Sequence, residues 1–177
     1  MSTDKPQLVY LGLGSNIGDR CLALQTALQP IDRLLRTTVL RCSHVYETEP
    51  WGETNQDPFY NAAVEIQSAL EPEALLLALK TIERSMGRVT TVKNGPRLID
   101  IDILLYGDVV LNRDHIAIPH PMLAQRKFVL SPLCEMAGDV LHPVEQVTSA
   151  ELARVCTDSG RIWIREDCTA LYRHEQL

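Results

Sequence analysis

Hydrophobic residues recur along the first part of the chain with two periods, one typical of strands and one typical of helices. Residues 8–13 form a short apolar run that ends at Gly14 and predicts a buried strand. A turn over 14–19 leads into a predicted helix, whose apolar face carries residues at +4, +7 and +11: Leu24, Leu28, Ile31 and Leu35. Pro30 lies inside this helix and is expected to kink or end it.

Two predicted strands, 39–46 and 59–67, follow one another with no helix between them. A polar, turn-rich loop over 48–58 separates them. One face of the second strand is apolar. The other face includes Asn61 and Glu65 and is too polar to be core throughout.

A second helix is predicted to begin near Pro72 and to end near Gly87. Its apolar stripe consists of Leu75, Leu76, Leu79, Ile82 and Met86. A basic loop over 88–97 separates it from a strand predicted over 98–106. Beyond that strand we expect a hairpin turn into 109–111, two short helices, and short strands at 115–118, 128–130 and 161–164.

The order of the main elements is strand, helix, strand, strand, helix, strand, which predicts an α+β fold. It is the βαββαβ order of ferredoxin-like domains, an antiparallel sheet with helices packed on one face, here followed by a C-terminal extension. A doubly wound parallel sheet fits less well, because two strands follow one another directly. With 177 residues, the chain has the length of about one domain. We therefore expect residues 1–177 to form a single domain.

Composition excludes several classes of protein. Hydrophobic residues make up 45% and charged residues 23%, which is typical of a globular chain. The net charge of −6 argues against a sequence-independent nucleic-acid binder. The longest apolar run, 74–79, is far shorter than the about 20 residues of a bilayer span, and the first residues do not form a signal peptide. We expect a cytoplasmic protein that binds neither nucleic acid nor membranes and needs no obligate protein partner.

The cysteines are scattered and include no Cys-x-x-Cys pair: Cys21, Cys42, Cys134, Cys156 and Cys168. This spacing argues against a zinc site and against a disulfide framework. Five free thiols would fit a reducing cytosol.

The sharpest chemical signal is the pair of acids in Asp100-Ile101-Asp102. Residues two apart point to the same side of a strand, so Asp100 and Asp102 share one face. At about 3.3 Å per residue their side chains start roughly 6.6 Å apart, and the carboxylates can converge on two hard cations. They would otherwise repel each other. The alternative is a solvated strand face with both acids in water.

Basic residues adjoin this pair. Arg97 precedes Asp100 by three residues, and Arg88 lies at the other end of the loop. Guanidinium groups match phosphate oxygens and stay charged, so we predict that the loop meets the phosphates of a nucleotide held through magnesium. The alternative is that Arg97 simply pairs with Asp100 or Asp102. The chain has no glycine-rich Gly-x-x-x-x-Gly-Lys phosphate loop.

Two further polar residues stand out. Glu83 lies on the apolar stripe of the second helix, and His120 is held between two prolines. Each has a plainer interpretation, a boundary ion pair for Glu83 and an ordinary turn for His120.

Aromatic side chains lie near polar ones at two places. Phe59 and Asn61 share one face of their strand, and Arg126 and Phe128 would do so if that stretch were extended. An aromatic ring beside an amide suits a flat heteroaromatic ligand, which the ring stacks on and the amide hydrogen-bonds. The alternative for each aromatic is ordinary core packing.

Taken together, these residues resemble the 6-hydroxymethyl-7,8-dihydropterin pyrophosphokinase family of folate biosynthesis. The resemblance covers about residues 8–143, and the tail over 144–177 matches weakly. The matching segments fall in order at 13–16, 46–52, 59–64, 82–88, 95–104, 119–120 and 126–128. The most specific is the Gly-Pro-Arg block that ends in the acid pair.

The resemblance implies transfer of a pyrophosphoryl group from the co-substrate ATP to the hydroxymethyl oxygen of the pterin, giving AMP and the pterin diphosphate. It implies two Mg²⁺ ions on Asp100 and Asp102. The implied catalytic residues are Arg88, Arg97, Asp100 and Asp102. The implied ATP-binding residues are Glu83, Arg97, Ile103, His120 and Arg126. The implied pterin-binding residues are Thr48, Pro50, Trp51, Gly52, Phe59, Asn61, Asp100 and Phe128.

The chain departs from the bacterial form of the pattern at several positions, of which Lys80 lies on the nucleotide side. The loop after Gly87 is short, and the changed positions are Lys80 for glutamine, Thr90 for arginine, Asn94 for tryptophan and Phe59 for tyrosine. These changes leave the acid pair intact but bear on how the loop covers bound substrates, where we expect ordering on binding. Two rival functions stay open: a non-catalytic ferredoxin-like module that senses a small ligand, and a metal-dependent Asp-x-Asp nucleotidyl or glycosyl transferase.

Overall fold

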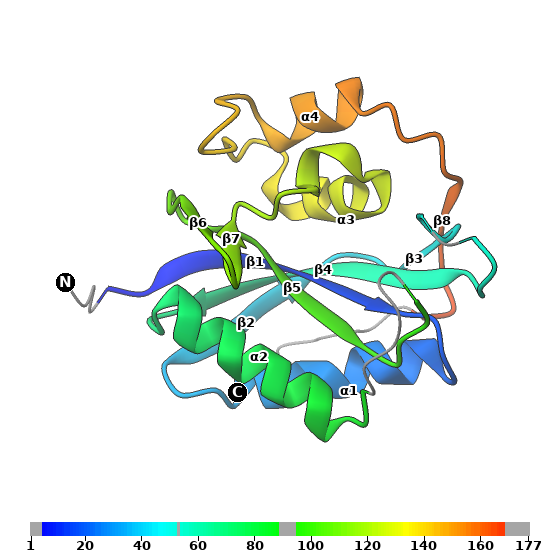
Figure 1. The fold of residues 1–177 in the computed structure, drawn as a ribbon, viewed down its shortest axis with the longest axis horizontal. Coiled ribbons are helices and arrows are strands. Elements are labelled where there is room, and N and C mark those ends of the chain that lie inside the picture. The colour runs from blue at the N-terminus through cyan, green and yellow to red at the C-terminus, as the bar shows by residue number, and fades with distance from the viewer. Residues whose placement is uncertain (1–4, 53, 89–94, 169–177) are drawn as a thin grey trace.

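The structure is a computed structural model that describes residues 5–52, 54–88 and 95–168 (Figure 1). Its elements, in chain order, are β1 (Gln7–Ser15), α1 (Arg20–Asp32), β2 (Thr37–Cys42), β3 (Tyr46–Thr48), β4 (Phe59–Ser68), α2 (Pro72–Ser85), β5 (Asp100–Tyr106), β6 (Leu111–Arg113), β7 (Ile116–Ile118), the 3₁₀ helix η1 (Leu123–Gln125), α3 (Lys127–Ala137), α4 (Ser149–Val155) and β8 (Ile162–Ile164). The predicted α+β class is confirmed.

One antiparallel sheet organises the molecule. Its strands run in the order β5-β1-β4, and the far edge of β4 pairs with β2 along one half and with β3 along the other. β8, from the C-terminal part of the chain, adds to the outer edge of β3. The antiparallel sheet predicted from the element order is therefore confirmed.

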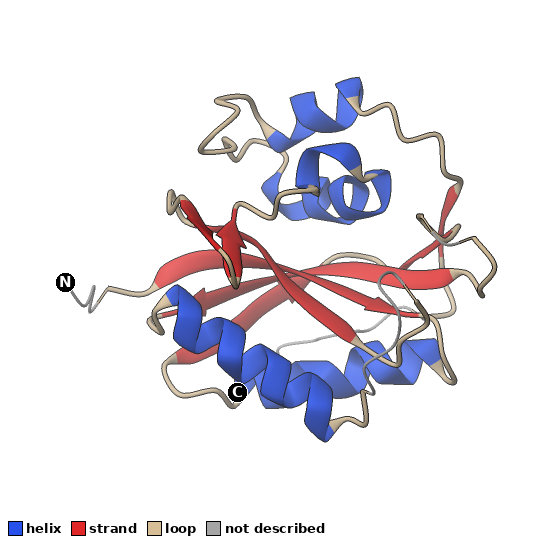
Figure 2. Cartoon of the chain, in the orientation of Figure 1, coloured by secondary structure: helices blue, strands red, loops and turns tan. Residues whose placement is uncertain are grey.

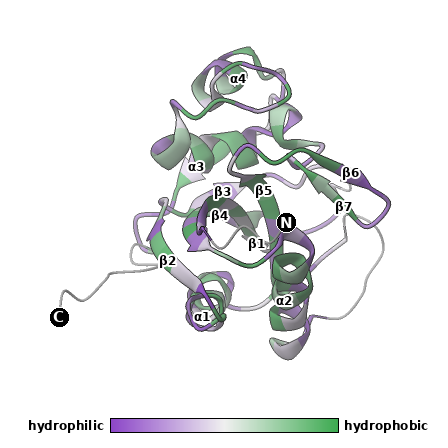
Figure 3. Cartoon of the chain, turned by 90° about the vertical axis from the view of Figure 1, so that its left-hand side faces the viewer, coloured by the Kyte–Doolittle hydropathy of each residue, from purple (hydrophilic) through white to green (hydrophobic). Residues whose placement is uncertain are grey.

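Helices cover both faces of this sheet. α1 and α2 lie on one face, and α3 lies on the other with α4 packed outside it (Figures 1 and 2). The expectation of helices on one face is wrong for α3. The physical reason is that the mixed face of β4 is buried, with Asn61 and Glu65 each 7% exposed. Buried apolar residues form two core clusters on opposite sides of the sheet. Hydrophobic segments are found both in the strands and in the helices that cover them (Figure 3).

Three predicted strands differ from the structure. The strand expected over 39–46 is two strands, because the hydroxyl of Ser43 accepts a hydrogen bond from the backbone of Ala63 and interrupts the ladder. The stretch 128–130 belongs to α3; a short apolar run does not distinguish a strand from a buried helix. Residues 109–111 do not pair back on β5, since β6 pairs with β7 instead.

The first helix also ends earlier than its apolar spacing indicates. α1 stops at Asp32, two residues after Pro30. The chain then reverses at Arg36, which adopts a positive φ of 58°, and Asp32 accepts a hydrogen bond from the backbone of Val39. Leu35 therefore lies outside the helix and is 77% exposed.

The expectation of five free thiols is wrong. Cys21 on α1 and Cys168 form a disulfide, with Cα atoms 5.8 Å apart across a sequence separation of 147. Spacing along the sequence carries no signal for such a pair, because folding alone brings the tail back to α1. Cys42, Cys134 and Cys156 are free. None of the described helices has the length and hydrophobicity needed to cross a bilayer.

Candidate active site

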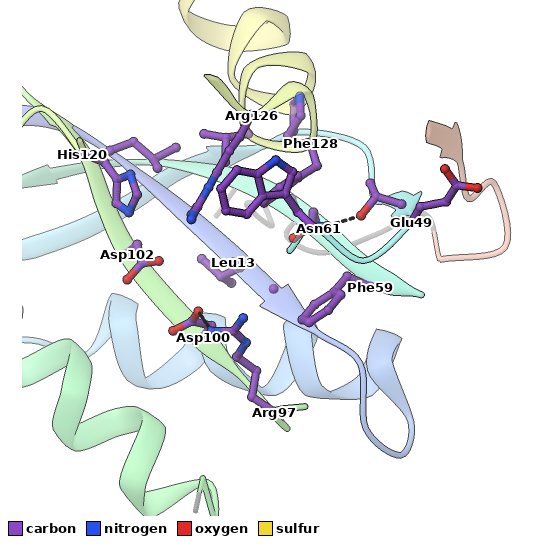
Figure 4. Close-up of a pocket in the computed structure, with 18 of the residues that line it drawn as sticks. Leu13, Glu49, Phe59, Asn61, Arg97, Asp100, Asp102, His120, Arg126 and Phe128 are labelled. Carbon is purple, nitrogen blue, oxygen red and sulfur yellow. Dashed lines mark hydrogen bonds and ion pairs between the residues drawn. The ribbon is translucent and has the colours of Figure 1, made fainter. Parts of the chain in front are cut away.

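The register of three strands builds the floor of a cavity of about 330 Å³. On β1, Gly14 pairs with Asp100 of β5 on one side and with Asn61 of β4 on the other. Two residues away, Gly12 pairs with Asp102 and with Ala63. The two glycines leave the centre of this face free of side chains, so the acid pair and the amide of Asn61 flank an open floor (Figure 4).

Both glycines are closely packed. A Cβ on Gly14 would lie 3.0 Å from the Oδ1 atom of Asn61, and one on Gly12 would lie 3.2 Å from a methyl carbon of Leu104. A side chain at Gly14 would therefore push Asn61 from its place. A glycine at every second position of a strand is the sequence signal of such a floor.

Asp100 forms ion pairs with three basic side chains. Its oxygens lie 2.6 Å from Arg88 Nη1, 2.8 Å from Arg97 Nη1 and 3.7 Å from Lys80 Nζ. Burial alone would raise the pKa of Asp100, but the positive charges of Arg97, Lys80 and Arg88 outweigh it and hold the pKa below its ordinary value. The alternative in which Arg97 pairs with an acid is therefore the arrangement of this structure.

Asp102 is less enclosed. Its side chain is 37% exposed, and its Oδ1 atom lies 3.2 Å from Lys80 Nζ. Both acids face the cavity rather than bulk water, so the solvated-face alternative does not describe them (Figure 4).

Glu83 anchors helix α2 to strand β5. Its side chain is 3% exposed, and its Oε1 atom accepts hydrogen bonds from the backbone of Ile101 at 2.6 Å and from Lys80 at 2.8 Å. Arg88 pairs with its other oxygen. Burial raises the pKa of Glu83, although Lys80 and the Ile101 N–H favour the carboxylate. The plainer interpretation, an ion pair, is correct. We call Lys80, Glu83, Arg88, Arg97, Asp100 and Asp102 the charged cluster.

Aromatic rings line the part of the cavity next to the charged cluster, and the guanidinium of Arg97 lies 5.4 Å from the centre of the Phe59 ring at their boundary. Trp51, Phe59 and Phe128 come from the loop after β3, the start of β4 and the first turn of α3. The guanidinium of Arg126 lies 4.5 Å from the centre of the Trp51 ring and 5.7 Å from that of Phe128. Arg126 and Phe128 thus lie together although only Arg126 is extended.

The amide of Asn61 is held in place beside these rings. Its Nδ2 atom donates a 2.7 Å hydrogen bond to Thr48 Oγ1, and both side chains are buried. This bond leaves the edge of the amide pointing along the cavity floor (Figure 4). A flat ring with donors and acceptors on its rim suits such a wall.

His120 presents one ring nitrogen to the cavity. Its Nδ1 atom accepts a 3.1 Å hydrogen bond from the backbone of Met122, and the backbone N–H of His120 donates to the backbone oxygen of Leu104. Burial lowers its pKa, and the positive charge of Arg126 adds to this against the opposing pull of Asp102. Because Nδ1 accepts, the proton of the neutral ring lies on Nε2, which is a donor. His120 therefore forms part of a turn and still has a ring donor for a ligand, so the two interpretations of this residue are compatible.

Two arginines keep unused donors at the cavity. The Nε atoms of Arg97 and Arg126 are buried without a hydrogen-bond partner among the described residues. Within the same part of the chain, Arg126 has no carboxylate within ion-pair distance, and its pKa is lowered by burial. Arginine stays charged at such sites, so these groups fit an anion such as phosphate.

The donor set fits magnesium better than an all-protein metal cage. Asp100 and Asp102 offer hard oxygen ligands on one face, and magnesium typically binds through one or two carboxylates with phosphates and water. Across the described residues no group of three or more His, Cys, Asp or Glu side chains is arranged to hold a metal by itself.

Of the predicted site residues, most line this one cavity: Thr48, Trp51, Phe59, Asn61, Arg88, Arg97, Asp100, Asp102, His120, Arg126 and Phe128. Pro50, Gly52, Glu83 and Ile103 do not line it, and Ile103 is part of the core. Thr90 and Asn94 lie outside the described residues.

Sequence reasoning missed several lining residues. Lys80 lies at the centre of the charged cluster; the sequence marked it as a departure from the family pattern but did not place it among the site residues. Glu49 also lines the cavity and is tied to the tail by a 2.7 Å bond from Arg161. The two floor glycines carried a signal in their alternation that a search for nucleotide-binding loops does not detect.

Comparison with known proteins gives consistent results. The sequence profile of the 7,8-dihydro-6-hydroxymethylpterin-pyrophosphokinase (HPPK) family matches residues 10–138. The folic acid synthesis protein fol1 of Pneumocystis carinii is 40% identical over 171 residues, which is 97% of this chain and 23% of that protein. The 2-amino-4-hydroxy-6-hydroxymethyldihydropteridine pyrophosphokinase of Aquifex aeolicus is 43% identical over 136 residues, which is 77% of this chain and 84% of that protein.

Solved structures agree at the level of the fold. Wild-type Plasmodium falciparum HPPK-DHPS superposes with a TM-score of 0.68 at 19% identity, over 87% of this chain and 44% of that chain. The chain thus spans less than a quarter of the fol1 protein and less than half of the HPPK-DHPS chain, but most of the Aquifex protein. From its matched profile and its relatives, the chain belongs to the 7,8-dihydro-6-hydroxymethylpterin-pyrophosphokinase family.

Proposed function

We propose that this protein transfers a pyrophosphoryl group from ATP to 6-hydroxymethyl-7,8-dihydropterin, giving AMP and the pterin diphosphate, as a step of tetrahydrofolate biosynthesis. The observation that carries the proposal is a single cavity with two chemically different ends. One end holds the charged cluster, which suits phosphates and metal ions. The other end combines aromatic rings with a fixed amide, which suits a flat heteroaromatic ring.

The pterin occupies the aromatic end in this proposal. Phe59 and Phe128 contact the faces of its ring, and Asn61 hydrogen-bonds its edge. Thr48 holds the amide of Asn61, and the loop with Pro50, Trp51 and Gly52 closes that side. Asp100 is paired with Gly14 on the adjacent strand. It lies at the boundary between the aromatic and the charged ends, where the hydroxymethyl group would meet the phosphates.

ATP occupies the charged end. Arg97 and Arg126 have unused N–H donors for its phosphates, and His120 offers Nε2–H. Glu83 and Ile103 act from behind the cavity wall by fixing Lys80 and strand β5. Two Mg²⁺ ions would be held by Asp100 and Asp102, and they would neutralise the phosphate oxygens when bound.

The chemistry needs no protein nucleophile. The hydroxymethyl oxygen attacks the β-phosphorus of ATP, the bond from that phosphorus to the α–β bridging oxygen breaks, and AMP leaves while the hydroxyl proton passes to solvent. The residues of the cavity contribute alignment of the two substrates and stabilisation of charge. Arg88 and Arg97 exchange their contacts with Asp100 for phosphate oxygens as the substrates bind.

The proposal also covers the core topology, the domain organisation and the location of the protein. The strand order β5-β1-β4-β2, with α1 and α2 as the crossovers, supports a ferredoxin-like core. We propose that residues 1–177 form one pyrophosphokinase domain acting on small molecules. A cytoplasmic location stays a prediction, and the Cys21–Cys168 disulfide removes the argument from free thiols.

Product analysis tests the proposed reaction. The protein is incubated with ATP, magnesium and the hydroxymethyl pterin, and products are followed by ³¹P NMR and mass spectrometry. AMP together with a diphosphorylated pterin supports the proposal. Free pyrophosphate would indicate a nucleotidyl transferase, and binding without turnover would indicate a sensing module.

A further inference from the structure

We propose that Lys80 is a built-in counter-ion of the acid pair, which occupies part of the magnesium site in the unliganded protein and thereby sets how much magnesium the protein needs. This inference rests on the proposed function for the identity of the metal. It concerns a residue that the family resemblance marks as a departure and to which it gives no role in the site.

The ammonium of Lys80 is saturated by acceptors around the acid pair. Its Nζ atom lies 2.8 Å from Glu83 Oε1, 2.9 Å from the backbone oxygen of Ile101 and 3.2 Å from Asp102 Oδ1. A lysine has three N–H donors, and these three acceptors use all of them. Asp100 Oδ1 is a fourth oxygen at 3.7 Å. Helix α2 therefore inserts one positive charge between both acids.

Asp100 and Asp102 differ in how many cations other than Lys80 they contact. Asp100 also has Arg88 and Arg97 as partners. For Asp102, Lys80 is the one cation within ion-pair distance among residues 5–52, 54–88 and 95–168. A magnesium ion on Asp102 therefore competes with the ammonium for the same carboxylate, since ion and ammonium cannot both contact Oδ1 closely.

The balance of charge points the same way. The charged cluster holds three acidic and three basic side chains, so it is neutral as a whole. Lys80 supplies one of these positive charges, and its ammonium lies within ion-pair distance of all three acids. Without Lys80 the cluster carries an excess negative charge beside the partly exposed Asp102, which favours a divalent cation.

The test compares Lys80→Gln with Arg84→Gln. Arg84 lies on the same helix, and its substitution removes the same charge from an exposed position that contacts Thr81. Binding of magnesium alone is measured by calorimetry, and melting is measured in EDTA and in magnesium. We expect Lys80→Gln to bind magnesium about tenfold more tightly than wild type, to melt lower in EDTA, and to gain more from magnesium. Arg84→Gln should match wild type in all three measurements.

Two further variants keep the test decisive. Lys80→Met removes the charge without adding an oxygen ligand and should also bind magnesium more tightly, whereas Lys80→Arg keeps the charge and should stay near wild type. Unchanged or weaker magnesium binding in both neutral variants would overturn the inference. If a neutral variant is unfolded in EDTA, refolding by magnesium supports the inference, and failure of magnesium to refold it contradicts it. Because none of these measurements involves turnover, failure of the proposed reaction is seen separately in the product analysis.

Discussion

Gly14 lies so close to Asn61 that a methyl group on its Cα would sit 3.0 Å from the amide oxygen of Asn61. The two residues are paired on neighbouring strands β1 and β4, and on the other side of β1 Gly14 is paired with Asp100 of β5. The distance between the proposed pterin and phosphate ends of the cavity is therefore fixed by one strand of backbone.

We expect Gly14→Ala to raise the KM for the pterin by about tenfold or more, because the displaced amide no longer meets the ring edge. The KM for ATP should change little. Gly12→Ala is the comparison, since its nearest neighbour is the flexible side chain of Leu104 rather than Asn61. Steady-state kinetics with each substrate varied in turn measure both effects. Equal changes in the two KM values for Gly14→Ala would contradict this placement of the pterin.

Asp102→Asn is expected to abolish turnover and to leave the melting temperature within a few degrees of wild type. The reason is that Asp102 is only partly buried, its partner Lys80 keeps Glu83 and the backbone of Ile101 as acceptors, and its removal relieves repulsion with Asp100. Thermal melts and product formation are measured on the same preparation. A variant that keeps near-normal turnover would remove Asp102 from the proposed metal site.

Asp100→Asn should also lose turnover, but with a lower melting temperature, because Arg88, Arg97 and Lys80 all lose an ion-pair partner. The pKa of Asp100 is depressed in the folded state, so its charged form stabilises the protein above the unfolded-state pKa of about 3.9. That stabilisation is lost as the pH falls through the folded-state pKa. The gap in unfolding free energy between wild type and Asp100→Asn is therefore expected to be full above about pH 5 and to shrink below it, as denaturant titrations at several pH values can measure.

Trp51 should report binding at the aromatic end. Arg126 stacks on its ring, so a phosphate that attracts Arg126 and a pterin that enters beside the ring both alter its surroundings. We expect tryptophan emission to change more with pterin and an ATP analogue together than with either alone, and Trp51→Phe to abolish the change. Trp163 is 47% exposed on β8 and serves as the control through Trp163→Phe. A signal that survives in Trp51→Phe and disappears in Trp163→Phe would place the substrate nearer the tail.

The tail should stabilise the protein through its tether. The Cys21–Cys168 disulfide closes a loop across a separation of 147 residues, and loops of that length stabilise by up to about 5 kcal/mol. Reducing agent is expected to lower the melting temperature of wild type and to leave Cys168→Ser unchanged. Because β8 pairs with β3 next to Thr48, the reduced protein should also show a higher KM for the pterin. An identical melt with and without reducing agent would argue against the tether.

The sequence by itself determined the parts of this protein that depend on local chemistry. Alternation along one strand places Asp100 and Asp102 on a common face whatever the strand packs against, and the order of helical and strand periods specified an α+β fold with an antiparallel sheet. Asn61 and the aromatic residues were found because each is unusual for its own segment.

Tertiary structure decided what depends on partners distant in sequence. The run 128–130 is a helix because it packs across the second face of the sheet, where Tyr10 and Leu104 cover it. Lys80 joins the site because α2 crosses β5 at that level, and Cys168 reaches Cys21 because the tail folds back across the sheet edge. Local patterns fix which side of an element a residue occupies, whereas the charges and thiols it meets depend on the packing of whole elements.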